Sequence, residues 1–333
     1  MSEYYITDSV KHFTGGYGVE FLIFFGLVYF VHKLAPLLFT LVQVYFFSGH
    51  SLEEFGAGTG AWAVITGCTD GIGEEFALQL AKAKFNIVLV SRTQSKLDNL
   101  ASSIQDKYNV ETKTVAIDYS KATEKDFENL GSIVSQIPVR VLINNVGLSH
   151  EFPVAFHEES IDRTRDILKV NIDGLVNTTY SVLPEIIKNS KKEKGLILNM
   201  GSFSGLIPSA YLAPYSASKA FLCTFSQALG PELEKLNVAV QCTNTYFVVS
   251  KMSKIRKPSF FIPTAEKYVK VVLGKLGIPG GAFTPFTSTP YPSHALINWA
   301  YETFLSRKFW VDMSADMHRD IRKRALAKRA RQA

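Results

Sequence analysis

The sequence is short of cysteine and of charge. Of its 333 residues only three are cysteine, Cys68, Cys223 and Cys242. Their odd number and unpaired spacing exclude a disulfide framework and a cysteine zinc site, and suggest a reducing compartment. The seven histidines show no metal-ligand spacing, so we expect no metal. Charged residues make up 20% and hydrophobic residues 47%, which excludes a disordered or fibrous chain and leaves room for one large α/β domain with appendages.

The net charge of +6 is confined to the C-terminal end. Residues 307–333 carry nine basic side chains against three acidic ones, and the other 306 residues carry 27 of each sign. No broad basic face for a nucleic acid is therefore expected. Within the basic tail (311–333), residues 319–333 alternate basic and apolar side chains and predict a short basic helix. Three uses stay open for it: attraction to an anionic leaflet, an address for the endoplasmic reticulum, or a solvated end.

A long apolar run lies near the N-terminus. Residues 21–47 contain only three strongly polar side chains, His32, Lys33 and Gln43. About 20 apolar residues cross a hydrocarbon core of roughly 30 Å, whereas the apolar region of a signal peptide has about 7 to 15. We therefore expect a membrane anchor at residues 18–47, after an N-terminal segment (1–17) and before a flexible linker (48–60); a buried core helix is the alternative. Lys33 and Pro36 leave two paths open, one tilted crossing or a re-entrant bend.

From residue 61 to about 280 the pattern changes to short β-branched runs alternating with amphipathic stretches. Six candidate strands cover residues 61–66, 86–91, 112–118, 139–144, 195–200 and 238–243. Helical spacing of apolar residues lies between them, most clearly at 74–84, 94–108 and 213–236. This alternation predicts an α/β fold, a doubly wound parallel sheet of the Rossmann type covered on both faces.

A glycine-rich turn follows the first predicted strand. Gly67, Gly71 and Gly73 stand in TGCTDGIG, directly before a predicted helix. Glycines let backbone N–H groups and the positive helix end approach a pyrophosphate, so the turn predicts dinucleotide binding. Arg92 follows the second strand, where a carboxylate would hold the ribose of NAD; its guanidinium suits the 2′-phosphate of NADP. Asp118 ends the third strand, where it accepts from an adenine amine or caps the turn.

Four polar residues form a candidate catalytic group. Tyr215 and Lys219 are one helical turn apart in YSASK, so they share a face. An ammonium near a phenol favours the phenolate, and we expect it to lower a pKa of about 10 toward working pH. Ser202, at the end of the fifth strand, is placed to bond the same substrate oxygen. Asn171, on a preceding helix, is placed to hold a water that supplies protons to Lys219.

These motifs resemble the short-chain dehydrogenase/reductase family over residues 61–276. TGCTDGIG is similar to its TGxxxGxG, NNVG at 144–147 to its NNAG, and Asn171, Ser202, Tyr215 and Lys219 to its catalytic tetrad. The resemblance implies that Tyr215 donates a proton to a carbonyl, Ser202 polarises that oxygen, Asn171 supports a proton relay, and Lys219 binds the nicotinamide ribose. It also implies further cofactor contacts from Thr69, Ile72, Asn145, Gly147, Val248 and Ser250.

One departure concerns the loop after the sixth strand. The wider family has Pro-Gly-x-Val-x-Thr there, whereas residues 245–250 read TYFVVS. Val248 and Ser250 keep the last two roles, and the loop toward the substrate is expected to differ. Four basic residues follow, Lys251, Lys254, Arg256 and Lys257, either near CoA phosphates or anionic lipid or simply solvated.

A narrower resemblance is to the membrane-bound very-long-chain 3-oxoacyl-CoA reductases of microsomal fatty-acid elongation and the related 17β-hydroxysteroid dehydrogenases. The anchor, NMGSFSGLIP, YFVVSKM and SHALINWAY carry it. It implies NADPH-dependent reduction of a long-chain acyl-CoA at the endoplasmic reticulum membrane, with a cytosolic catalytic domain, contact with membrane lipid and other elongation enzymes nearby. The alternatives are a steroid or retinoid dehydrogenase and a non-catalytic membrane scaffold.

The segment at residues 281–310 is rich in proline, threonine and aromatic residues. Its apolar stretch at 294–305 is too short to span a bilayer. Three roles stay open: a substrate lid, a segment dipping into the membrane interface beside the anchor, or completion of the core. We expect His294 within it to be structural.

Overall fold

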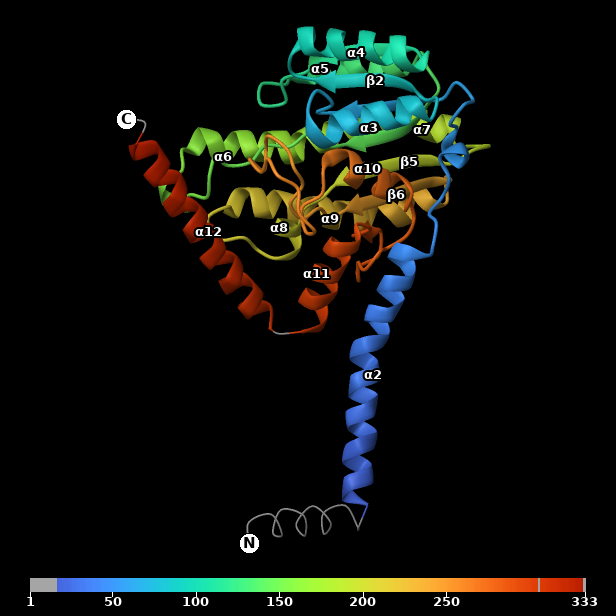
Figure 1. The fold of residues 1–333 in the computed structure, drawn as a ribbon. Coiled ribbons are helices and arrows are strands. Elements are labelled where there is room, and N and C mark those ends of the chain that lie inside the picture. Colours follow the sequence, from blue (N-terminus) through green and yellow to red (C-terminus); the bar gives the residue numbers. More distant parts are fainter. Residues whose placement is uncertain (1–16, 305, 332–333) are drawn as a thin grey trace.

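The protein is built around a seven-stranded parallel sheet (Figure 1). The structure, a computed structural model, describes residues 17–304 and 306–331. The strand order is β3-β2-β1-β4-β5-β6-β7, which confirms the predicted doubly wound sheet. The strands are β1 (Trp62–Thr66), β2 (Asn86–Ser91), β3 (Thr112–Ala116), β4 (Val139–Asn144), β5 (Gly195–Met200), β6 (Val238–Thr243) and β7 (Thr287–Ser288).

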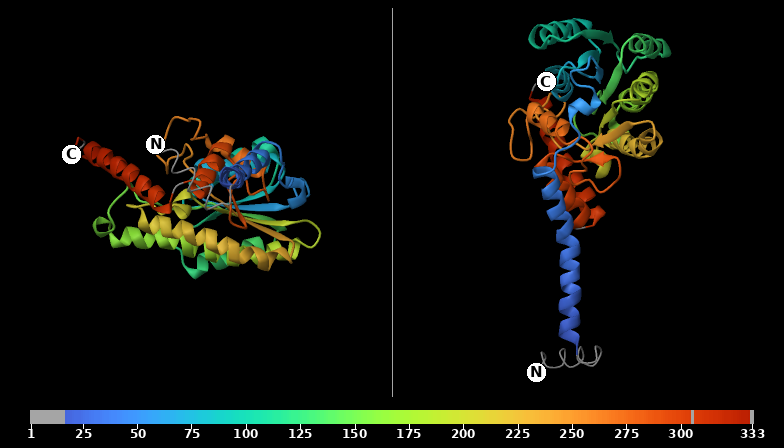
Figure 2. Two further views of the ribbon diagram at one scale, coloured as in Figure 1. Left: turned by 90° about the horizontal axis from the view of Figure 1, so that it is seen from below. Right: turned by 90° about the vertical axis from the view of Figure 1, so that its right-hand side faces the viewer.

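Helices cover both faces of this sheet because its strands bury side chains on both sides; every residue of β1 and β5 is buried. One face packs on α3 (Gly71–Lys82), α4 (Gln94–Tyr108) and α10 (Ala265–Leu273). The other packs on α5 (Glu124–Val134), α7 (Gly174–Asn189) and α9 (Ala213–Glu234), as the view from below shows (Figure 2). Shorter helical elements are η1 (Leu52–Phe55), η2 (Phe156–Glu158), α6 (Ile161–Leu168), the π-helical η3 (Lys169–Asp173) and α8 (Phe203–Leu206).

Two parts of the chain differ from expectation. The two-residue strand β7 pairs with Cys242 and Thr243 at the sheet edge, and its pattern is too short to be recognised in the sequence. The expected flexible linker is instead held against the domain: the backbone N–H of Gly49 donates to the carbonyl of Gly274, and Phe55 is fully buried. Burial of an aromatic side chain fixes this segment.

The N-terminal apolar run forms one continuous helix, α2 (Gly18–Tyr45), with Pro36 inside it. It projects from the domain (Figure 1), and its side chains from Val19 to Val31 are mostly exposed. Within the described residues it is the one helix long and apolar enough to cross a membrane. Its uninterrupted course shows no re-entrant bend, and the exposed face does not fit a buried core helix. Apart from Tyr17, the predicted N-terminal segment 1–17 lies outside the described residues.

Two helices close the chain. α11 (Pro292–Thr303) packs against α2, and α12 (Arg307–Ala330) turns back past α8 toward α6 (Figure 1). The predicted basic helix therefore begins at Arg307 rather than Arg319, because Ser306 caps it by accepting from the N–H of Phe309. Arg322 pairs with Glu158 and Arg329 with Glu151, so two of the tail's charges bind the domain itself.

Candidate active site

The predicted site residues meet at the carboxyl ends of the strands. They follow β1, β2, β3, β4, β5 and β6 in turn. The strand order reverses between β1 and β4, which pair directly, and such a switch point is where open α/β sheets bind ligands. Only β7 contributes no predicted residue to this edge.

The glycine turn brings β1, β4 and α3 close together. Gly67 has φ +65°, and a side chain on Gly73 would begin 2.2 Å from the Gly67 carbonyl oxygen, so neither position tolerates a larger residue. The Asn145 side chain donates to the carbonyls of Thr66 and Gly67, at 3.0 and 3.1 Å. Asn145 therefore holds the shape of the turn as well as standing at its edge.

The start of α3 fits a dinucleotide phosphate. The first N–H groups of a helix have no acceptor within the helix, and the Asp70 side chain at the N-cap does not bond them. Asp70 pairs instead with Lys251, at 2.5 Å. Gly71 has φ +58°, and a Cβ there would lie 3.4 Å from the Ser250 Cβ. Free donors, a positive helix end and a cradle without side chains suit an anionic group.

Other residues that are predicted to bind the dinucleotide lie along the same edge of the sheet. Arg92 is exposed directly after β2. Ser91, the residue before Arg92, shares a 2.9 Å hydroxyl hydrogen bond with Thr69 of the glycine turn. Arg92 therefore stands next to the glycine turn, with its guanidinium open to solvent. Of the two roles left open for Asp118, the structure shows the turn cap: its carboxylate accepts from the N–H and hydroxyl of Ser120.

Three of the four predicted catalytic side chains lie on two helices that pack together, α8 and α9. Tyr215 and Lys219 lie one turn apart on α9, and Ser202 is the N-cap of α8, accepting from the N–H of Ser204. A side chain on Gly205 would begin 2.6 Å from the Lys219 backbone, so this glycine lets α8 lie against α9. The packing brings the Ser202 hydroxyl close to the phenol of Tyr215.

The pKa values differ from expectation. Burial raises the pKa of Tyr215, and the nearby Ser202 hydroxyl only partly offsets this rise. The predicted lowering by Lys219 is not found, because the Lys219 Nζ lies 5.9 Å from the centre of the tyrosine ring and burial lowers the pKa of the lysine itself to about 8. Its Nζ donates to the Met200 carbonyl at 2.8 Å. Tyr215 is thus a protonated phenol at neutral pH, the form a proton donor requires.

Asn171 lies in η3, a single π-helical turn of the kind often found at functional sites. Its side chain accepts from the N–H of Leu148 at 2.7 Å and donates to the Leu148 carbonyl and the Ser218 hydroxyl. Ser218 in turn donates to the backbone carbonyl of Tyr215. The amide thus ties the loop after β4 to α9, and its water-holding role stays a prediction. Gly147 lies beside it, since a Cβ there would meet the Asn171 Oδ1 and the Lys219 Nζ, each at 3.6 Å.

The loop after β6 lies against the glycine turn. Val248 is buried, its carbonyl accepts from Ser253, and Ser250 lies beside Gly71. Of the four basic residues that follow, Lys251 pairs with Asp70, and Lys254 donates to the Glu151 carbonyl at 2.6 Å. Two of the four thus have partners in the domain, whereas Arg256 and Lys257 are exposed.

Sequence reasoning missed an aromatic cluster behind this loop. His294 is fully buried among Phe203, Tyr246, Tyr268 and Tyr291. Burial lowers the pKa of His294 to about 4, so the ring is neutral at working pH, and its Nε2 lies 3.2 Å from the Phe261 carbonyl. This environment fits the expected structural role. The spacing of aromatic residues along 246–291 carries no periodic signal that would have revealed the cluster.

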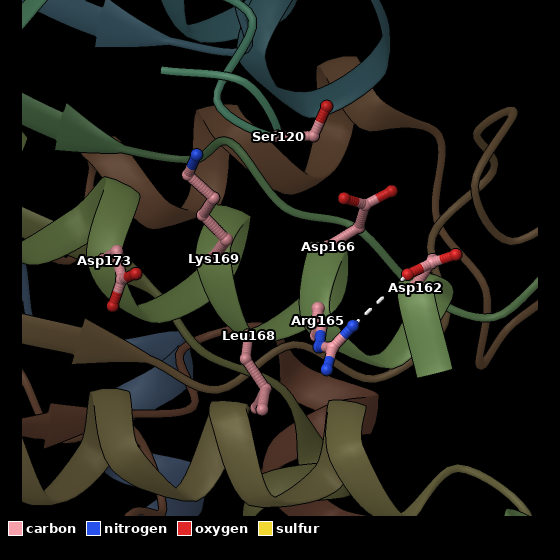
Figure 3. A pocket seen from close by; sticks show the side chains of 7 residues that line it. All are labelled: Ser120, Asp162, Arg165, Asp166, Leu168, Lys169 and Asp173. Carbon is pink, nitrogen blue, oxygen red and sulfur yellow. Dashed lines mark hydrogen bonds and ion pairs between the residues drawn. The ribbon is translucent and has the colours of Figure 1, made fainter. Parts of the chain in front are cut away.

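One surface hollow lies apart from the predicted site residues. This hollow along α6 and η3 is lined by none of the predicted site residues (Figure 3); its lining is Ser120, Asp162, Arg165, Asp166, Leu168, Lys169 and Asp173. No group of three or more potential metal ligands occurs in the part of the chain that the structure describes.

Known proteins resemble the chain at two levels. Solved structures match the fold: a 7β-hydroxysteroid dehydrogenase has a TM-score of 0.66 at 20% identity, covering 77% of this chain and 96% of its own. A short-chain dehydrogenase from Sphingobium yanoikuyae, in complex with NADPH, has a TM-score of 0.60 at 22% identity, covering 73% and 92%.

Curated relatives match almost the whole length. The very-long-chain 3-oxoacyl-CoA reductase of Schizosaccharomyces pombe is 46% identical over 312 residues, 92% of each chain. The protein of the same name from Scheffersomyces stipitis is 43% identical over 339 aligned positions, 98% of each chain. The family model for short chain dehydrogenases matches residues 61–259. The sheet, the glycine turn and these matches together show that this chain belongs to the short-chain dehydrogenase family.

Proposed function

We propose that this protein reduces very-long-chain 3-oxoacyl-CoA to 3-hydroxyacyl-CoA with NADPH, anchored in the endoplasmic reticulum membrane with its catalytic domain in the cytosol. One observation carries the proposal. The family model ends at residue 259, but the relatives named very-long-chain 3-oxoacyl-CoA reductase match up to 98% of the chain. Their similarity therefore includes α2, α11 and α12, which lie outside the part matched by the family model.

The geometry around Tyr215 supports a carbonyl reduction. When bound, the reduced nicotinamide supplies a hydride to the carbonyl carbon. The Ser202 hydroxyl hydrogen-bonds the carbonyl oxygen, and Tyr215 donates its phenolic proton to that oxygen, which gives the neutral 3-hydroxy product. The raised pKa of Tyr215 keeps this proton in place until it is needed. Lys219, protonated below a pKa of about 8, supplies positive charge one helical turn away.

Residues at the glycine turn would hold the dinucleotide. The N-terminus of α3 would bind the pyrophosphate, with Thr69, Ile72, Asn145, Gly147, Val248 and Ser250 around it. We propose that Arg92 binds the 2′-phosphate of NADPH, because an exposed guanidinium can form a charge-assisted fork with a phosphate. Asp118, whose carboxylate accepts a hydrogen bond from Ser120, would lie at the adenine end of the cofactor.

Membrane attachment fits a lipid substrate. A very long acyl chain partitions into the bilayer, so a catalyst anchored there meets it at a high local concentration. The exposed apolar side chains of α2 support this attachment. In elongation, we expect enzymes that make the 3-oxo group and that dehydrate the 3-hydroxy group to lie nearby.

The test is NADPH consumption by the full-length protein in membranes, with a long-chain 3-oxoacyl-CoA and, separately, a 17-ketosteroid. We expect turnover of the CoA ester, and Tyr215→Phe should reduce it by about 10² to 10⁴-fold. The control is Tyr180→Phe, because Tyr180 is 81% exposed on α7. Turnover of the steroid alone would contradict the proposed substrate, and full activity of Tyr215→Phe would contradict the proposed catalytic residue.

A further inference from the structure

The connection between α11 and α12 exposes aromatic side chains beside the anchor. We call residues 299–304 and 306–310 the elbow. Trp299 packs edge-on against Phe304, with ring centres 4.8 Å apart, and Phe309 packs against Trp310. Phe304 and Phe309 are 44% and 46% exposed, and the flanking Arg307 and Lys308 are also exposed. Exposed aromatic residues next to basic ones are typical of a protein surface at the level of lipid headgroups.

Two hydrogen bonds fix the position of the elbow along α2. The Lys33 Nζ donates to the Thr303 carbonyl at 2.9 Å, and the Trp299 indole N–H donates to the Lys33 carbonyl at 3.4 Å. Figure 1 and the right-hand view of Figure 2 show the lower ends of α11 and α12 partway along α2, below the sheet. The elbow therefore lies at the depth of Lys33.

That depth is within the bilayer if α2 crosses it. Glu20 directly precedes the apolar run, so the run begins at Phe21. A crossing helix needs about 20 residues for a core of roughly 30 Å, and therefore extends beyond Lys33 to about Thr40. At 1.5 Å per residue, Lys33 lies about 18 Å from the start of the run, roughly 12 Å inside the near edge of the core. An isolated ammonium at this depth is costly, but the Thr303 carbonyl partners it.

We propose that the elbow is a second membrane contact, inserted into the near leaflet of a phospholipid bilayer beside α2. The inference rests on the proposed anchoring by α2. Its apolar side chains lie among the upper acyl chains, while Arg307 and Lys308 reach the phosphates. Within the elbow, the Tyr301 hydroxyl donates to the Leu206 carbonyl of α8, whose N-cap is Ser202. The contact thus holds the catalytic edge of the sheet close to the membrane surface.

The experiment compares two positions on α12 in the full-length protein. Phe309→Cys and Leu326→Cys are matched, since these side chains are 46% and 42% exposed, and the three native cysteines are buried. Each variant is labelled with a polarity-sensitive fluorophore and placed in phosphatidylcholine nanodiscs with or without brominated acyl chains. We expect roughly twofold or greater quenching at position 309 and none at 326, because about 26 Å of helix separates them.

Intrinsic fluorescence gives a second measurement without labels. The chain has three tryptophans, and Trp62, the first residue of β1, is buried with 3% exposure. Brominated lipid should quench the unmodified protein, and Trp299→Phe/Trp310→Phe should abolish that quenching. Retention in nanodiscs with equal quenching at 309 and 326 would overturn the elbow contact alone. Release of the protein from nanodiscs by salt would overturn the anchor and the elbow together.

Discussion

The two halves of the catalytic edge are held together by different means. In the half formed by β1, β2 and β4, the close contacts are made to the backbone: the Gly73 position lies against the Gly67 carbonyl, and the Asn145 side-chain amide donates to two backbone oxygens. In the half formed by β5, β6 and β7, side chains from distant segments make the contacts. His294 lies among four aromatic rings, and Tyr301 reaches α8.

This difference matches the proposed roles of the halves. A phosphate is bound by backbone N–H groups, so its site tolerates little variation in shape and depends on glycines. A long acyl chain carries no phosphate for backbone N–H groups to bind. The half of the edge that would face this chain is therefore built from apolar and aromatic side chains, and such packing differs between substrates. Changes in the first half should therefore alter cofactor binding, and changes in the second should alter turnover of the acyl substrate.

The largest effect is expected for Gly73→Ala. The new Cβ would begin 2.2 Å from the Gly67 carbonyl and 2.4 Å from the Asn145 amide, so the turn must open. We expect cofactor affinity to fall by about 10²-fold, roughly 3 kcal/mol, in line with overpacking of a closely packed site. Titration of NADPH by fluorescence measures this.

Gly131→Ala is the matched control, because this helical glycine of α5 has its nearest neighbour atom at 3.8 Å. It should bind NADPH as the unmodified protein does. An unchanged NADPH affinity in Gly73→Ala would contradict the role assigned to the glycine turn.

Gly205→Ala tests the second half in the same way. Its Cβ would begin 2.6 Å from the Lys219 backbone, which must push α8 and Ser202 away from α9. We expect kcat to fall by about 10-fold or more, at a stability cost of about 1 to 3 kcal/mol, while NADPH affinity stays unchanged. A loss of NADPH affinity as large as that of Gly73→Ala would remove the distinction between the halves.

Much of the first half was predictable from the sequence, and little of the second. The six strands with alternating or continuous apolar runs and the glycine turn are local patterns, and they appear where expected. Gly205 has no such signal, because its importance comes from its contact with the backbone of Lys219, which lies on the next helix along the chain. The two-residue β7 and the packing of α11 on α2 likewise depend on tertiary contacts that no short window contains.

The pKa of Tyr215 shows the same limit. The spacing of Tyr215 and Lys219 predicts a shared helix face, which the structure has, but burial decides the sign of both pKa shifts. How deeply each side chain is buried depends on neighbouring elements such as α8, which packs on α9, and not on the spacing within α9. The sequence therefore identifies the candidate groups without their electrostatics.

Arg92→Gln should change the choice of cofactor without affecting the acyl side. Loss of a charge-assisted contact to phosphate costs about 1.5 to 3 kcal/mol, so the preference for NADPH over NADH should fall about 10 to 100-fold. The ratio of the kcat/KM values for the two cofactors measures it. Arg165→Gln, in the hollow away from the site, is the control. An unchanged ratio in Arg92→Gln would remove this residue from the cofactor site.

The pH profile of reduction should report Lys219. Its pKa is lowered to about 8 by burial, so its charge is present below this pH and is lost as the pH rises through it. We expect kcat/KM for reduction to be level below about pH 8 and to fall above it by about tenfold per unit. Because burial raises the pKa of Tyr215, that phenol stays protonated over this range. Lys219→Arg should move the fall to higher pH, since a guanidinium keeps its proton.

The smallest effect is expected where α12 meets the loop before α6. Arg322 pairs with Glu158 and lies near the Pro153 carbonyl, and its side chain is only 17% exposed. Arg322→Gln should cost about 1 kcal/mol of folding free energy, and should raise the KM for the acyl-CoA while kcat and NADPH affinity stay the same.

Arg329 offers the comparison, because its ion pair with Glu151 joins side chains that are 54% and 64% exposed. Water and salt screen such a pair, so Arg329→Gln should leave both stability and KM nearly unchanged. Urea unfolding and acyl-CoA titrations at low and high salt separate the two variants. If Arg322→Gln instead lowered NADPH affinity, α12 would act on the cofactor half of the edge. That result would contradict the assignment of α12 to the acyl half.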